Sequence, residues 1–206
     1  GIHTPQTDIN DLMVELALKG HLVLRLKGGD VSLFSNVLDE LQVLKKNDIS
    51  YELIPGVSAA FGAAAYTGIP LTARGHSRGV RFLTLYDLST VKHAQWQDWA
   101  ETDDTLVFYM SGQKLAELTQ KLVRIGIDPE KGIAIVQQAT TPYQKTTIRS
   151  FYDLNRKGLP DFEYVPTLII IGNVVNLHKQ YAWITEGNTA ESYFDNHKNT
   201  FQYAAG

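Results

Sequence analysis

The stretch VLRLKGGDVSLF, residues 23–34, places two glycines and an aspartate directly after a short apolar run. In open α/β sheets, ligands bind beyond the carboxyl ends of strands, where N–H groups at helix starts lack partners. Gly28 and Gly29 would let a ligand approach the backbone, and Asp30 would accept hydrogen bonds from hydroxyl or amino groups. The same residues fit a tight turn with Asp30 as a helix cap. Spacing alone leaves both interpretations open.

Two other positions have side chains that could take part in chemistry. Met110 ends the run TLVFYM, where it is either a packed core residue or a contact at a strand end. Ser77 lies in the pattern GHSRG, residues 75–79, which matches the G-x-S-x-G of serine hydrolases. That motif requires a strand before the serine and a helix after it, whereas here a polar loop precedes it and an expected strand follows. We interpret the match as accidental.

Several cations are placed where they could meet an anionic ligand. Five lie near expected strand ends or in the polar connection 72–79: Arg25, Lys27, Arg74, Arg78 and Arg81. Solvated surface explains most of them, but an anionic substrate would need several. The six histidines show no H-x-x-x-H spacing, so we expect no metal. Without cysteine, the chain has neither thiolate nucleophiles nor disulfides.

Composition argues against two classes of partner. A net charge of −3 does not suit a general nucleic-acid binder, which usually carries a basic surplus. No apolar run approaches the roughly 18 residues that cross a bilayer, and no signal leader opens the sequence. We therefore expect a cytoplasmic protein that binds neither nucleic acid nor membrane.

Apolar periodicity in the first third of the chain predicts alternating helices and strands. Helical spacing recurs over residues 9–17 and 34–44, while short apolar runs at 22–26 and 51–54 predict strands. Ser58 is placed to cap an alanine-rich helix that follows it.

A second alternation follows the polar connection 72–79. Strands are expected at residues 80–85, 105–109, 133–136, 146–150 and 167–171, and helices at 95–100 and 115–123. The chain should therefore fold as two α/β lobes, residues 1–78 and 79–180. Periodicity is lost over 181–206, which we expect to be a loosely packed tail or a partner-contacting arm.

Five separated blocks of the sequence together resemble the tetrapyrrole methylase family. They are RLKGGD, IPGVSAAFGAAAYTGIPLTARG, LVFYM, ATTPYQ and PTLIIIGNVV, in the family's order over about residues 3–178. The resemblance implies two α/β lobes with mixed sheets, helices on both faces, a cleft between the lobes, a homodimer, and S-adenosylmethionine as cofactor. The blocks are most like those of members that methylate uroporphyrinogen III to precorrin-2, on the route to sirohaem and cobalamin.

The resemblance also implies roles for particular residues. Eight positions match residues that contact the cofactor in the family: Gly28, Gly29, Asp30, Leu33, Ser58, Ala59, Met110 and Ala139. Arg25 matches an arginine that we expect to contact an acetate or propionate group of uroporphyrinogen III.

Two departures from the family pattern bear on these assignments. The usual GGDPFxFGRG is replaced by GGDVSLFSNV, which changes the loop 31–37 beside the expected cleft. The sequence begins just after the position of the family's G-K-R stretch, so we expect an incomplete N-terminal lobe and name no catalytic acid or base. Two alternatives stay open: a family member with a corrin, diphthamide or ribosomal RNA acceptor, and a non-catalytic cofactor-binding or dimerisation module.

Overall fold

The computed structural model describes residues 4–85, 87–159 and 166–184. The chain divides between Ser58 and Ala59 into two compact units, here called unit 1 and unit 2 and described separately. This division falls earlier than the lobe boundary expected after residue 78, which stays a prediction. The tail expected over 181–206 lies outside the described residues from residue 185 onward.

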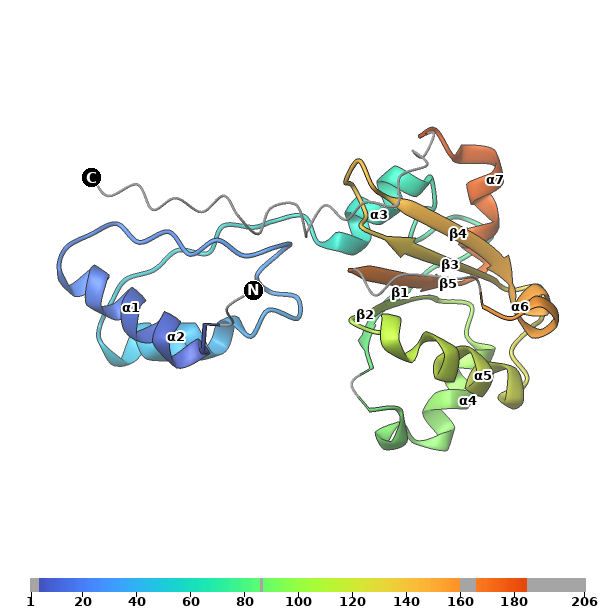
Figure 1. Ribbon diagram of the computed structural model, residues 1–206, viewed down its shortest axis with the longest axis horizontal. Helices are drawn as coiled ribbons and strands as arrows, with labels where there is room; N and C mark the ends of the chain where they lie inside the picture. Colours follow the sequence, from blue (N-terminus) through green and yellow to red (C-terminus); the bar gives the residue numbers. More distant parts are fainter. Residues whose placement is uncertain (1–3, 86, 160–165, 185–206) are drawn as a thin grey trace. The chain divides into compact units, whose positions relative to one another are not determined.

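Unit 1 contains two helices, α1 (Gln6–Leu18) and α2 (Val37–Lys46), joined and followed by long irregular segments (Figure 1). The helices predicted over 9–17 and 34–44 are therefore present. The second starts later than its apolar pattern, because Phe34 and Asn36 have left-handed φ values of 54° and 52°. A helix needs right-handed backbone, so residues before Val37 cannot belong to it.

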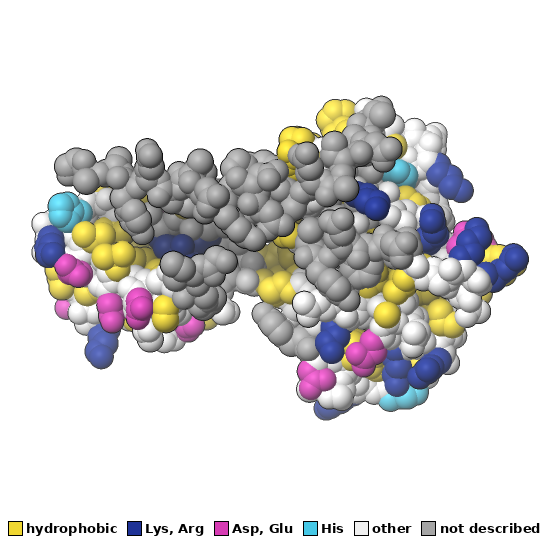
Figure 2. Space-filling view, in the orientation of Figure 1, with side chains coloured by type: hydrophobic (Ala, Val, Ile, Leu, Met, Phe, Trp, Pro, Cys, Tyr) yellow, Lys and Arg dark blue, Asp and Glu magenta, His cyan; other side chains and the backbone are white. Residues whose placement is uncertain are grey.

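The strands expected at 22–26 and 51–54 are absent from the described structure of unit 1. A short apolar run forms a strand only where a neighbouring strand makes hydrogen bonds to its N–H and C=O groups. Neither run has such a neighbouring strand here. Leu22, Leu24 and Leu26 are 101%, 75% and 75% exposed. Apolar side chains accordingly reach the surface of the part that contains α1 and α2 (Figure 2).

Unit 2 is built on a five-stranded mixed sheet in the order β1-β2-β5-β3-β4. Its strands are β1 (Val80–Thr84), β2 (Thr105–Tyr109), β3 (Gly132–Gln137), β4 (Lys145–Ser150) and β5 (Thr167–Ile171). The strand predictions for this region are confirmed. β1 is parallel to β2, and β5 is antiparallel to both β2 and β3. β1, β2 and β3 therefore end at the same edge of the sheet, here called the carboxyl edge.

Helices cover both faces of this sheet (Figure 1). One face packs against α4 (His93–Glu101), α5 (Leu115–Ile125) and α6 (Phe151–Lys157). The other packs against α3 (Ala59–Thr67) and the short helix η3 (Asn173–Leu177), which is followed by α7 (His178–Tyr181). Alternate residues of each central strand face opposite layers, as Val107 and Phe108 do, which explains why these strands are apolar throughout. The predicted α/β class with a mixed sheet is confirmed.

Candidate functional site

In unit 1 the Gly-Gly-Asp segment lies against residues 56–58. Asp30 Oδ1 accepts hydrogen bonds from the backbone N–H of Ser32 at 2.8 Å and from the Ser32 hydroxyl. Asp30 Oδ2 accepts one from Gly56 N at 2.8 Å. The Cβ position of Gly29 would lie 3.6 Å from Ser58 Cα. The structure therefore brings together Gly29, Asp30 and Ser58, which sequence reasoning had placed in one site.

The carboxylate of Asp30 is strongly acidic. Hydrogen bonds from the Ser32 hydroxyl, the Gly56 N–H and the Ser32 N–H lower its pKa to about 2. The ionised carboxylate thus joins two loops of unit 1. Its predicted contact with a cofactor is a further role that would have to use the remaining acceptor capacity of its oxygens.

The structural requirement for glycine differs among the three glycines of these loops, Gly28, Gly29 and Gly56. Gly29 has a left-handed φ of 78°, which other residues adopt at a cost. A Cβ on Gly56 would lie 2.4 Å from the carbonyl oxygen of Gly29. A Cβ on Gly28 would have no atom within 4 Å, and the φ of Gly28 is not in the left-handed region. The fold of unit 1 needs glycine at 29 and 56, but it does not need one at 28, which is exposed.

Arg25 is held by a buried acid that sequence reasoning missed. Glu40, which is 4% exposed, accepts hydrogen bonds from Arg25 Nε at 3.2 Å and from Gln6 Nε2 at 3.0 Å. Lys27 Nζ lies 3.1 Å from its other carboxylate oxygen. Burial raises the pKa of Glu40, but the hydrogen bonds from Lys27 and Gln6 and the charges of Lys27 and Arg25 lower it overall. The substrate contact predicted for Arg25 stays a prediction.

The sequence contains a signal that could have identified Glu40, and the structure also places Leu33. Glu40 shares a face of α2 with Val37 and Leu44, three and four positions away, and an acid buried at such a place needs a cationic partner. Leu33, predicted as an apolar cofactor contact, is half-buried, and its N–H donates to Asp30 O at 3.2 Å.

In unit 2 the neighbours of three predicted cofactor contacts meet at the carboxyl edge. Ala59 opens α3, Met110 follows β2, and Ala139 follows β3. The N–H of Ala60 donates to the hydroxyl of Tyr109 at 3.0 Å, which joins the start of α3 to the end of β2. A Cβ on Gly62 would lie 2.9 Å from Thr140 Cγ2, so α3 also contacts the turn after β3.

The backbone at this edge contains left-handed residues that are not glycine. Met110, Gln138 and Thr140 have φ values of 53°, 48° and 67°. The N–H of Thr140 donates to Gln144 Oε1 at 2.8 Å, and the Thr141 hydroxyl donates to Gln138 O at 2.8 Å. Such backbone persists only where its surroundings hold it, and it clusters at functional sites. Met110 is 53% exposed, so the alternative of a packed core residue is wrong.

Two of the candidate residues have structural roles instead. The Ser77 hydroxyl donates to Gly79 O at 2.8 Å and accepts from Thr105 N at 3.0 Å, and β1 rather than a helix follows it. The interpretation of GHSRG as an accidental match is confirmed. Arg81 Nε donates to Asp104 Oδ2 at 2.7 Å, near the start of β1 and β2. Arg81 therefore lies near the start of β1, at the end of the strand opposite to the carboxyl edge.

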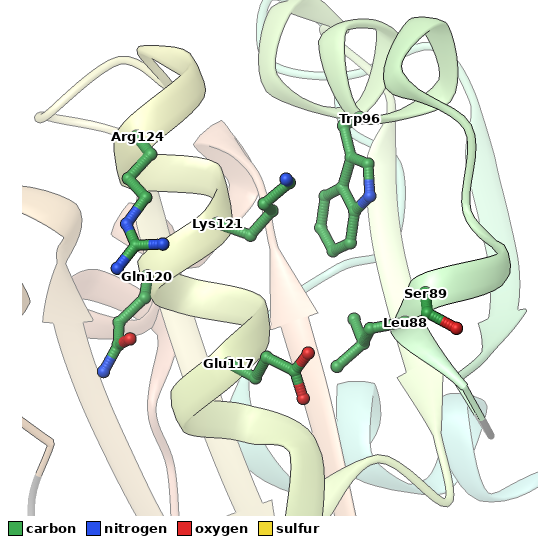
Figure 3. Close-up of a pocket in the computed structure, with 7 residues that line it drawn as sticks. All are labelled: Leu88, Ser89, Trp96, Glu117, Gln120, Lys121 and Arg124. Atoms are coloured by element: carbon green, nitrogen blue, oxygen red, sulfur yellow. The ribbon is translucent and has the colours of Figure 1, made fainter.

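A pocket of about 230 Å³ lies elsewhere in unit 2, between α4, α5 and the short helix η1 (Leu88–Thr90) (Figure 3). Its lining comprises Leu88, Ser89, Trp96, Glu117, Gln120, Lys121 and Arg124. None of these is a predicted site residue, and the pocket is on the sheet face opposite α3.

The described part of the chain was also compared with two other kinds of site. It contains no cluster of three or more His, Asp and Glu side chains that could hold a metal ion. Among its helices, none has the length and apolar character needed to span a membrane.

Comparison with known protein families gives the class of protein to which the chain belongs. Residues 2–155 match the tetrapyrrole (corrin/porphyrin) methylases. The chain belongs to this family, which confirms the resemblance drawn from its five sequence blocks.

Among curated proteins, the chain is similar to siroheme synthases. Siroheme synthase from Neisseria meningitidis is 40% identical over 192 residues, covering 93% of this chain and 39% of that protein. Siroheme synthase from Psychrobacter arcticus is 41% identical over 182 residues, covering 86% of this chain and 32% of that protein. The chain thus spans well under half the length of these relatives.

The structural comparisons agree with the sequence comparisons. Uroporphyrin-III C-methyl transferase from Thermus thermophilus, in complex with S-adenyl homocysteine, gives a TM-score of 0.67 at 26% identity, covering 84% of this chain and 75% of that one. Cobalt precorrin-4 methyltransferase gives a TM-score of 0.71 at 20% identity, covering 85% of this chain and 73% of that one, a likeness of fold.

Proposed function

We propose that this chain is the methyltransferase part of an enzyme that transfers methyl groups from S-adenosylmethionine to uroporphyrinogen III, giving precorrin-2. Family membership, the siroheme synthase relatives and the Thermus methyltransferase structure support the proposal. The observation that carries it is Gly28, a glycine at which a Cβ would meet nothing within 4 Å. The open space beside it and the adjacent small residues fit a ligand that lies against the backbone.

The proposed cofactor supplies, when bound, an electrophilic methyl group on a sulfonium. In the proposal, Gly28 and Gly29 leave room for it, and Asp30 holds their loop through its bond to Gly56. Ala59 and Ala139 leave space at the carboxyl edge, and the exposed side chain of Met110 excludes water from the bound ligand. These residues position and dehydrate the donor, and such positioning supplies up to ~7–11 kcal/mol in favourable cases.

Arg25 belongs to the acceptor side of the proposal. Its side chain is 36% exposed, and Arg25 and Lys27 together carry one more positive charge than Glu40 can neutralise. This excess suits an acceptor rich in acetate and propionate groups. We also propose that the protein is cytoplasmic and forms a homodimer. Sedimentation velocity would test the oligomeric state.

The experiment combines binding and turnover. The chain is titrated with S-adenosylhomocysteine by calorimetry, and is incubated with uroporphyrinogen III and methyl-labelled S-adenosylmethionine. Binding together with labelled precorrin-2 is the expected result. Binding without labelled product would favour another acceptor, as the altered loop 31–37 allows. If the chain neither binds S-adenosylhomocysteine nor transfers a methyl group, the result would favour a non-catalytic dimerisation module.

A further inference from the structure

The start of α3 receives its hydrogen-bond acceptor from a distant part of the chain. The first N–H groups of a helix have no partner within the helix, and usually the side chain of the capping residue accepts from one of them. In α3 the N–H of Ala60 donates to the hydroxyl of Tyr109, 49 residues later in the sequence, at 3.0 Å. Because Tyr109 is the last residue of β2, this bond ties the helix start to the carboxyl edge.

The ring of Tyr109 is fixed by two other aromatic residues. It packs edge-on against Phe82 of β1, with ring centroids 6.2 Å apart and an interplanar angle of 79°. Phe82 in turn packs against Phe61 of α3, with centroids 5.9 Å apart at 60°. Both Phe82 and Tyr109 pack against the buried cluster that includes Ala60 and Val107. The hydroxyl is therefore held in one place rather than free to swing.

The chemistry of the hydroxyl suits a permanent acceptor. Burial raises the pKa of Tyr109, and the hydrogen bond from the Ala60 N–H opposes this only in part. The phenol thus stays neutral at physiological pH, so the bond to Ala60 does not depend on pH there.

The two ends of this link stand next to two predicted cofactor contacts. Ala59 directly precedes Ala60, and Met110 directly follows Tyr109 with its left-handed φ of 53°. A change in the bond between Ala60 and Tyr109 would therefore move the helix start relative to the strand end. We propose that Tyr109 is a positioning residue, whose hydroxyl holds Ala59 and Met110 in the arrangement that binds the cofactor. This inference rests on the proposed function.

The test is Tyr109→Phe, which removes the hydroxyl and keeps the ring. Without ligand, the Ala60 amide should exchange faster, because its acceptor is lost. S-adenosylhomocysteine should bind about fivefold more weakly, because part of the binding free energy must then order the helix start against the strand end. In turnover, KM for S-adenosylmethionine should rise more than kcat falls. The matched control is Tyr152→Phe, which removes the hydroxyl that accepts from Arg156 Nη1 at 3.1 Å in α6 and should change none of these quantities.

The outcomes separate this inference from the proposed function. Wild-type protein that binds no S-adenosylhomocysteine would defeat both, even with faster Ala60 exchange in the variant. Wild-type binding with an unchanged affinity in Tyr109→Phe would overturn the inference alone, as would unchanged exchange at Ala60. If Tyr109→Phe does not fold, Phe82→Leu keeps the hydroxyl but removes its support. That variant should weaken binding in the same direction, and unchanged affinity would overturn the inference.

Discussion

Gly28 and Gly56 belong to the same pair of loops, but a methyl group added at each position meets different surroundings. Nothing lies within 4 Å of a Cβ on Gly28. We therefore expect Gly28→Ala to fold as the wild type does and to bind S-adenosylhomocysteine about tenfold more weakly, because the methyl group would occupy space that the ligand needs. Circular dichroism and calorimetry measure the two effects. Equal affinity in variant and wild type would contradict a cofactor contact at Gly28.

Gly56→Ala is the comparison variant. Its Cβ would lie 2.4 Å from the carbonyl oxygen of Gly29, so the backbone has to move whether or not ligand is present. Amide resonances of Gly29 and Asp30 should shift in the ligand-free variant, whereas Gly28→Ala should leave distant resonances in place. A ligand-free Gly56→Ala spectrum identical to the wild type would show that the two loops are not in contact in solution.

Asp30 should make the contact between these loops resistant to acid. Its folded pKa is about 2, below the ordinary value of 3.8, so its contribution to stability is fully present above the ordinary value. The contribution is lost as the pH falls from 3.8 through the folded pKa of about 2, because over that range the unfolded state binds the proton and the folded state does not. Below the folded pKa both states hold the proton and no contribution remains. The amide shift of Gly56 should stay constant from neutral pH to about pH 4 and titrate with a midpoint near 2. Asp30→Asn should abolish the titration, and a wild-type midpoint at the ordinary value would argue against the bond.

Among the elements, β3 and α4 are joined by a buried lysine. Lys131, which is 6% exposed, precedes β3 and donates through Nζ to Ala100 O at 3.1 Å and Thr102 O at 2.8 Å, at the C-terminus of α4. Lys131→Met keeps an apolar chain of similar length and leaves both carbonyl groups without this donor. We expect the free energy of unfolding to fall by about 1–3 kcal/mol in urea denaturation. Lys145→Met, at an exposed position of β4, is the control and should change little.

The same lysine predicts a pH dependence in the alkaline range. Burial lowers the pKa of Lys131 below its ordinary value of 10.5, and the charges of Asp103 and Asp128 oppose this. At lower pH both folded and unfolded states hold the proton, so the cost of burying the charge is fully present. As the pH rises from the folded pKa to 10.5, the unfolded state binds more protons and folding becomes more favourable. Wild type should therefore gain stability relative to Lys131→Met over that range, and a constant difference would contradict a lowered pKa.

The strands and helices of unit 2 could be predicted from the sequence because their burial is reflected in their amino-acid composition. The run TLIII of β5 is apolar at every position, and its last four residues are buried between two layers. The runs at 22–26 and 51–54 are similarly apolar, but a strand also needs a neighbour, which the residues of a run do not reveal. Helix α6 (Phe151–Lys157) was missed, since it buries only Phe151 and Leu154 and so shows little apolar periodicity.

The candidate site could be predicted only in part, for a related reason. Gly28, Asp30 and Met110 stand in blocks that resemble a family, so their positions were recognisable. The partners of Glu40 and Tyr109 are 15 and 49 residues away in the sequence. Local pattern can show that an acid on the apolar face of α2 needs a partner, but it does not show which residue that partner is. The reason for glycine at position 56 is likewise a contact with the backbone of Gly29, which only the folded chain shows.

For the molecule as a whole, the two units differ greatly in how much apolar surface they bury. Within residues 4–58, Met13 is the only hydrophobic residue that is buried, while several leucines are exposed. Unit 2 buries two large clusters, one on each face of its sheet. Because apolar burial is the main favourable contribution to folding, unit 1 should open more readily than unit 2.

Hydrogen exchange followed by mass spectrometry would show this difference and would test the proposed ligand at the same time. Without ligand, amides of residues 4–58 should exchange much faster than those of β2, β3 and β5. A ligand that binds only the ordered form stabilises it by about 2.7 kcal/mol at a concentration of 100 Kd. S-adenosylhomocysteine bound through both Gly28 and Met110 should therefore slow exchange in both units. Gly28→Ala and Tyr109→Phe, which lie in different units, should each reduce this protection in both. Protection confined to one unit would mean that the proposed positions in the other do not contact the ligand.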